Sequence, residues 1–346
     1  MTVILPSMIN NRLSMFDVGH GDSILIQDEK GHSLLVDVGS STPHKYSHVP
    51  LIVNSGISPG RCGLVISHLH WDHYSLFRYF QKAATTFSKL YLPDLPMTGA
   101  NSNATQAIFD FLRVAIALDF GRYRLLPEIL ANSHLSRVWC SKGTIIDEIN
   151  PKLRVIWPDF SKSILSKKSF SAIAVKVRNK IEPIIRKYQI RTPPEMPADY
   201  SMDAFFRDIE RQELIYREIP EDETAKKSMY RVLAEAERIF LPLANMFSLA
   251  FRTNYHMKPR FLFLGDLPEK ALNQIQLPKS RFYEFIKAAH HGTEYGSSLR
   301  NVVTNYLLIS RADNGSNLTP LNQRYINRNH FNMLLSTSYL GDCYFL

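Results

Sequence analysis

The chain has 346 residues, of which 45% are hydrophobic, 21% charged and 11% aromatic, and these ordinary values exclude wholesale disorder and low-complexity repeats. Lysine and arginine number 41 against 32 aspartate and glutamate residues. The resulting formal charge of +9 favours polyanionic partners such as nucleic acid, although many basic proteins carry such a surplus only for solubility.

The apolar segments and the cysteines predict a cytoplasmic protein with no membrane span. Long apolar stretches such as 111–118 and 302–309 end well short of the roughly 20 residues that a membrane-spanning helix needs. The N-terminus lacks the order of basic segment, apolar core and cleavage site found in a secretory signal. Cys62, Cys140 and Cys343 are odd in number and far apart, which fits neither a disulfide framework nor a Cys-x-x-Cys metal site.

In chain order, the sequence begins with short β-rich runs. Residues 12–17, 23–27 and 33–38 have the spacing of a meander of short strands, with a polar turn before the third. An apolar run at 63–67 ends in a histidine-rich loop, and helical spacing follows at 74–84. The elements expected next are a strand at 89–92, a helix at 103–119 and strands at 136–140 and 153–157. This alternation predicts an α/β fold.

The character of the sequence changes over 159–240, where long charged helical patterns are broken by prolines. Residues 162–187 carry eight Lys and Arg against one acid, whereas 195–223 carry ten acids against three arginines. We expect a helical insertion here. Its charges serve either a solvated surface, or a basic arm for a phosphate backbone and an acidic face that docks a partner protein.

Strand patterns resume after this insertion. They lie at 246–252, 260–264, 281–289, 306–310, 335–337 and 343–346. Because β-rich segments flank the insertion on both sides, we expect one domain built from 1–158 and 241–346, with 159–240 inserted into it.

The loop after the strand at 63–67 carries the most informative motif. Three imidazoles and one carboxylate, His68, His70, Asp72 and His73, lie within six residues. These nitrogen and oxygen donors suit zinc, manganese or iron. Alternate residues point opposite ways, so His68 and His70 can face one metal while Asp72 and His73 face a second. Lone histidines are usually structural or solvated, but four ligand-type residues at this spacing indicate a metal site.

Two later strand ends supply further candidates. Asp266 follows the apolar run 261–264 and a glycine, a position that suits a carboxylate bridging two metals but also a simple helix cap. His290 and His291 end the strand pattern at 281–289 and precede a glycine. Lys287 is a nearby candidate for charge stabilisation, although a solvated surface position is expected for it.

These motifs resemble the metallo-β-lactamase fold, and within it the soluble domain of the DNA-uptake protein ComEC and its stand-alone relatives. The segment 16–23 resembles the family's Asp-Val-Gly-Gln-Gly-Asp opening, with His20 in the place of the glutamine. Asp37 resembles the structural aspartate that braces the metal loop, and 289–292 resembles Pro-His-His-Gly. The fold's usual lone histidine before the bridging aspartate has no clear match; His134 lies in that interval, in surroundings unlike the motif.

The resemblance implies a four-layer αβ/βα sandwich that holds two divalent metal ions, Zn or Mn. It implies as metal ligands His68, His70, Asp72, His73, Asp266 and His290, and as structural support Asp22 and Asp37. The first site then holds its ion through His68, His70, Asp266 and water. Which of His290 and His291 binds metal stays open.

Such a site is typical of a metal-dependent nuclease or phosphodiesterase that acts on nucleic acid or another phosphodiester. Asp72 would orient the nucleophile, and whichever of His290 and His291 does not bind metal would donate to a phosphate oxygen or leaving group. One alternative is hydrolysis of a small ester, lactone or phosphocholine-type substrate. Another is a metal-stabilised scaffold or sensor that binds a partner protein through 159–240.

Overall fold

The fold was analysed in a computed structural model. The structure describes residues 3–5, 12–82, 87–95, 102–118, 120, 123, 125, 129, 135–161, 167–188, 190, 202–211, 223–254, 258, 260–278, 282–311, 321–328, 330–337 and 342–345. The chain forms two compact units. The first, here called the sheet unit, consists of Met1–Pro93, His134–Asp159 and Asn245–Leu346, and the second, the helical unit, of Asp94–Ser133 and Phe160–Ala244.

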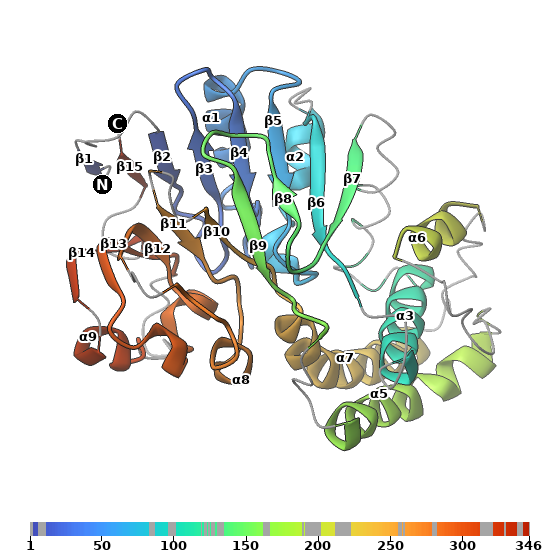
Figure 1. Ribbon diagram of the computed structural model, residues 1–346. Coiled ribbons are helices and arrows are strands. Elements are labelled where there is room, and N and C mark those ends of the chain that lie inside the picture. Colours follow the sequence, from blue (N-terminus) through green and yellow to red (C-terminus); the bar gives the residue numbers. More distant parts are fainter. Residues whose placement is uncertain are drawn as a thin grey trace. The chain divides into compact units, whose positions relative to one another are not determined.

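The sheet unit contains an eight-stranded mixed sheet with the order β1-β15-β2-β3-β4-β5-β6-β7 (Figure 1). Its strands are β1 (Val3–Leu5), β2 (Arg12–Met15), β3 (Ile24–Gln27), β4 (Ser33–Val36), β5 (Cys62–Val65), β6 (Lys89–Pro93), β7 (Ser136–Cys140) and β15 (Cys343–Phe345). The β2-β3-β4 meander is antiparallel, as the sequence predicts. From β4 to β7 the strands are parallel, and α1 (Val49–Gly56) and α2 (Phe77–Lys82) supply two of the crossovers that this direction requires.

A second, seven-stranded sheet of the same unit has the order β14-β13-β12-β11-β10-β9-β8. Its strands are β8 (Ile145–Ile146), β9 (Leu153–Trp157), β10 (Ala250–Thr253), β11 (Phe261–Phe263), β12 (Phe282–Lys287), β13 (Val303–Ile309) and β14 (His330–Ser336). The strands β11 to β14 are parallel. Short helices follow some of them: α8 (Glu269–Leu272), η3 (Ala289–Gly292), η4 (Ser297–Leu299) and α9 (Arg324–Arg328). The predicted α/β class is confirmed.

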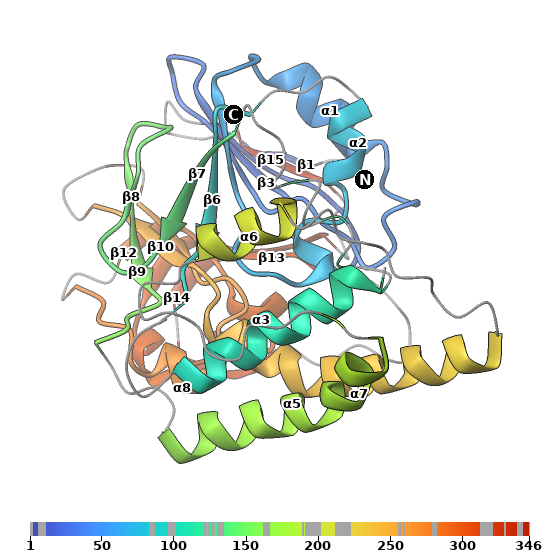
Figure 2. The ribbon, with the colours of Figure 1, turned by 90° about the vertical axis from the view of Figure 1, so that its right-hand side faces the viewer.

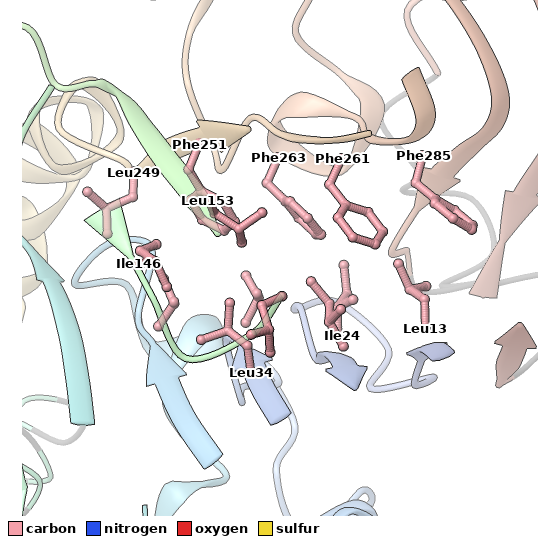
Figure 3. Packing of buried hydrophobic residues seen from close by; sticks show 14 of the residues in the cluster. Leu13, Ile24, Leu34, Ile146, Leu153, Leu249, Phe251, Phe261, Phe263 and Phe285 are labelled. Atoms are coloured by element: carbon pink, nitrogen blue, oxygen red, sulfur yellow. The ribbon is translucent and has the colours of Figure 1, made fainter. Parts of the chain in front are cut away.

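One hydrophobic core joins the facing sides of the two sheets. Figure 3 shows Phe251, Phe261, Phe263 and Phe285 of one sheet opposite Leu13, Ile24 and Leu34 of the other. Alternation along each strand explains this arrangement, because residues two apart, such as Phe261 and Phe263, point to the same face. Each large apolar side chain buried in this way contributes about 1.5–3 kcal/mol, so the core holds the strand ends that carry the polar loops in place.

In the described part of the helical unit lie the helices α3 (Ser102–Ala117), α5 (Lys167–Tyr188), α6 (Met202–Arg211) and α7 (Glu223–Met246), the last ending beyond the unit (Figure 2). Aromatic pairs join α3 to α6 and to α7, with ring centroids 4.4 Å apart for Phe109 and Phe205 and 4.7 Å apart for Phe111 and Phe240. Within the described residues, no helix combines the length and apolar character needed to cross a membrane.

Candidate metal centre

Loops at the carboxyl ends of three parallel strands of the sheet unit meet at one place. The loop after β5 carries His68, His70, Asp72 and His73, the turn after β11 carries Asp266, and the turn after β12 carries His290 and His291. Backbone hydrogen bonds connect the loops, from Leu249 N–H to Ser67 O (2.8 Å) and from His290 N–H to Gly265 O (3.0 Å). The fold therefore gathers candidate residues that are some 200 positions apart in the sequence.

Asp37 holds in place the loop 67–73, here called the metal loop. The carboxylate accepts hydrogen bonds from the Ser67 N–H (2.6 Å) and the Ser67 hydroxyl (2.8 Å). Its Oδ2 also lies 2.8 Å from His73 Nδ1, which turns the opposite ring nitrogen, Nε2, toward the centre of the site. Burial raises the pKa of Asp37. A carboxylate behind a ligating imidazole is a common support for metal sites, and Asp37 has that position.

Asp22 lies near the Nδ1 atoms of two imidazoles, those of His73 and His291. Its Oδ2 is 3.8 Å from His73 Nδ1 and its Oδ1 is 3.9 Å from His291 Nδ1. His291 Nδ1 also contacts Ser310 O at 3.0 Å. Because Asp22 faces the Nδ1 atoms rather than the Nε2 atoms, its place is that of a supporting carboxylate.

Lys287 is buried, which corrects the expectation of a solvated surface position. Its side chain is only 3% exposed and its ammonium group forms an ion pair with Asp22 Oδ2, while Asp266 Oδ1 lies 3.7 Å away. Burial by itself would lower the pKa of this amine, but Asp22 and Asp266 outweigh burial and raise the pKa. Strand alternation carried the missed signal, since Lys287 lies two residues after Phe285, which faces the core.

The Nε2 atoms of the buried histidines point toward Asp266 without hydrogen-bonding to it. The distances to Asp266 Oδ2 are 3.9 Å for His68, 3.5 Å for His73 and 3.6 Å for His291. In the described part of the chain, none of these Nε2 atoms has a hydrogen-bond partner, and neither does His70 Nε2. Unpaired buried polar atoms are costly, so a cluster of them needs an explanation.

The spacing of these atoms fits a metal ion. Distances of 3.5–3.9 Å exceed a normal hydrogen bond. Two atoms that bind the same ion through bonds of about 2.1 Å can lie up to about 4.2 Å apart. The buried group of Asp22, His73, Asp266 and His291 can hold a metal ion.

Asp72 faces several histidine nitrogens in the same site. Its Oδ2 lies 3.8 Å from His73 Nε2, 3.6 Å from His291 Nε2 and 3.8 Å from His20 Nε2. Near Asp266 on the other side, the rings of His68 and His70 are 4.3 Å apart. Two sets of donors are close enough to hold an ion, one of Asp22, His73, Asp266 and His291 and the other of His20, Asp72 and His291, so His291 belongs to both. The sequence alone assigns no role to His20, which the fold brings into this site.

The turn that carries His290 and His291 has an unusual backbone. Both residues have positive φ angles, 48° and 52°, and Gly292 follows at 81°. A left-handed conformation costs of order 1–3 kcal/mol for a residue other than glycine and persists where the surroundings impose it. The turn sends His291 into the site, where it is 3% exposed, while His290 is 36% exposed with its Nε2 3.8 Å from Asp266 Oδ2.

The histidines of the site differ in charge. Burial would lower the pKa of His73 and His291, but nearby carboxylates outweigh burial and raise both, so these two rings must lose a proton to bind a metal ion. Burial lowers the pKa of His68 well below its ordinary value and that of His70 to about 4, which keeps both rings neutral. Burial would raise the pKa of Asp72 and Asp266, but neighbouring histidines outweigh it and lower both well below the ordinary value. Neutral imidazoles and ionised carboxylates are the forms that bind metal. His134 lies outside the described residues.

Comparisons with known proteins add little to this geometry. No family model and no curated protein matches the sequence. The solved structures to which the chain is similar include a protein of unknown function from Enterococcus faecalis V583, with 18% sequence identity and a TM-score of 0.23. The similarity covers 43% of this chain and 38% of that chain. The function therefore has to be argued from the site itself.

Proposed function

We propose that the chain is a cytoplasmic metal-dependent hydrolase with the four-layer metallo-β-lactamase sandwich, and that it cleaves phosphodiester bonds in nucleic acid. The observation that carries the proposal is the convergence of unpaired Nε2 atoms on Asp266 and Asp72 at 3.5–3.9 Å. Nitrogen and carboxylate donors in this number suit two divalent ions, Zn or Mn.

The donors divide between two ions. His68, His70 and His290 would hold the first ion, and Asp72, His73 and His291 would hold the second. Asp266 would contribute to both, because its Oδ2 faces members of each group. Since both His290 and His291 face this oxygen, we assign both to metal, and the leaving-group proton then comes from solvent.

Two divalent ions in such a site activate a water near neutral pH and stabilise charge on the phosphate oxygens. The protein residues keep the donors in place for that chemistry. Asp72, 18% exposed, is the most exposed of the carboxylates in the site and would orient the attacking water. Asp37 and Asp22 hold the outer ring nitrogens, and Lys287 holds Asp22. The strained turn at His290 and His291 sets the direction of the last two imidazoles.

The test is metal analysis of the purified protein, followed by incubation with single-stranded DNA, double-stranded DNA, RNA and bis-p-nitrophenyl phosphate. We expect bound divalent metal, and hydrolysis that stops on chelation and returns with Zn or Mn. Metal-loaded protein that leaves every phosphodiester intact would overturn the proposal. Turnover of small esters or lactones would then favour the second hydrolase reading, and no turnover at all would favour the scaffold.

Salt dependence tests the class of substrate separately. If the net charge of +9 contributes to nucleic-acid binding, affinity should fall steeply with added salt, because binding releases counterions from the phosphate backbone. The measurement is fluorescence anisotropy of a labelled oligonucleotide on a catalytically inactive variant between about 50 and 200 mM salt. An affinity that does not change with salt would favour a small uncharged substrate.

A further inference from the structure

His20 lies at the open side of the second group of donors. Its side chain is 48% exposed, and its Nε2 is 3.8 Å from Asp72 Oδ2. The ring centroid is 4.5 Å from that of His291. The donor atoms of His20, Asp72 and His291 are mutually close enough to share one ion.

The loop that carries His20 is fixed against the metal loop. Gly21 lies so close to the backbone of Asp72 that a Cβ atom there would come within 2.7 Å of Asp72 O. On the other side of His20, Gly19 has a φ of 68°, and a Cβ atom there would lie 2.7 Å from the Tyr46 hydroxyl. Ser41 N–H donates to His20 O at 2.7 Å. Half exposure of His20 therefore does not mean free movement, because its backbone is held on both sides.

We propose that His20 is a further protein ligand of the second ion, binding it through Nε2. This inference rests on the proposed two-metal function. The 3.8 Å distance between His20 Nε2 and Asp72 Oδ2 is too long for a hydrogen bond but within the span of two atoms bonded to one ion.

The extra ligand makes the two ions unequal. Each ion would have three imidazoles, but the second would have two carboxylates, Asp72 and Asp266, whereas the first would have one carboxylate and the more exposed His290. With one more ligand and one more negative charge, the second ion should bind more tightly. The first should be the ion that exchanges and keeps an open position for substrate.

Stepwise metal titration tests this assignment without any activity measurement. Metal-free protein is titrated with Zn²⁺ in competition with a chromophoric chelator, and with Co²⁺ to record the visible absorption of the bound ion. The variant His20→Gln keeps side-chain length but removes the imidazole, and His290→Gln does the same at the first site. The control is His44→Gln, because His44 is an exposed histidine of the same unit.

We expect two binding steps in the wild-type protein. His20→Gln should weaken the tighter binding step at least about tenfold and change its Co²⁺ spectrum. His290→Gln should weaken only the looser step, which belongs to the first ion. His44→Gln should match the wild type.

Wild-type affinities and an unchanged Co²⁺ spectrum in His20→Gln would overturn the role of His20 and leave the two-metal hydrolase standing. A His20-dependent step in a protein that cleaves no phosphodiester would overturn the proposed function alone. A wild-type protein that takes up no metal would overturn both.

Discussion

Two buried aspartates, Asp266 in the sheet unit and Asp110 in the helical unit, behave in opposite ways. Both are at most 2% exposed, and each has oxygen atoms without a hydrogen-bond partner among the described residues. Around Asp266, the charges of His291, His73 and Lys287 outweigh burial and hold its pKa well below the ordinary value. This carboxylate stays ionised and faces several unpaired nitrogens.

Asp110, on α3, has no such surroundings. Burial is the largest influence and raises its pKa to about 6, because Arg178 and Arg113 offset burial only in part. The comparison teaches that a buried, unpaired carboxylate does not by itself indicate a metal site. What distinguishes the sheet unit is the convergence of several unpaired donors on one point.

The largest expected effect comes from removing the shared ligand. Asp266→Ala should abolish hydrolysis and lower metal affinity by more than about 100-fold, because the carboxylate faces donors of both groups and offsets the repulsion between two dications. Asp72→Ala should abolish hydrolysis as well. Metal content and turnover are measured together, with Asp110→Asn as the buried-aspartate control. Activity that survives in Asp72→Ala would show that the site is wrongly assigned.

Lys287→Met should destabilise the protein by about 3–5 kcal/mol, since it leaves the buried Asp22 without its ion-pair partner. Lys142→Met is the matched control, because the Lys142 to Asp159 pair (2.7 Å) has a half-exposed lysine and should cost no more than about 1 kcal/mol. Urea unfolding of both variants without metal measures the difference. Equal losses of unfolding free energy in the two variants would mean that the buried ion pair of Lys287 stabilises the protein no more than a surface ion pair does.

Asp110 should make stability depend on pH. Its pKa is higher in the folded protein than in the unfolded chain, so its contribution is fully present below about pH 4 and is lost as pH rises through about 6. Relative to wild type, Asp110→Asn should therefore gain about 1–3 kcal/mol between pH 4 and pH 7.5. Urea unfolding at several pH values checks this. A pH-independent difference would contradict the assigned pKa.

The smallest effect is expected at His134. Its sequence surroundings do not resemble a metal motif, so His134→Ala should leave turnover within about twofold of wild type, whereas His70→Ala should reduce it at least about 100-fold. Both variants are assayed with saturating metal. If His134→Ala is as damaging as His70→Ala, a ligand is missing from the site described above.

The sequence predicts the α/β class and the order of strands because both depend on local patterns. The meander at 12–38 is readable from alternation, and the metal loop at 68–73 from residue type and spacing. The sequence pattern also predicts that the candidate residues follow strands, namely β5 of one sheet and β11 and β12 of the other.

What the sequence could not supply was the pairing of residues across the fold. Lys287 reads as a surface lysine until its strand is known to face the core and Asp22, 265 residues away in the chain, is seen beside it. In the same way, His20 gains a role only through its distance to Asp72. The left-handed turn at His290 and His291 cannot be read from the sequence either, because a positive φ is uncommon for any residue other than glycine, even though histidine adopts it more often than most.

The most direct test of the central claim is anomalous diffraction from crystals grown with Zn²⁺ or Mn²⁺. The account predicts two peaks on either side of Asp266 Oδ2, one beside His68 and His70 and the other beside Asp72, His73 and His291, each with bonds of about 2.0–2.2 Å. Crystals from metal-saturated protein that show no peak bonded to Asp266 would contradict it.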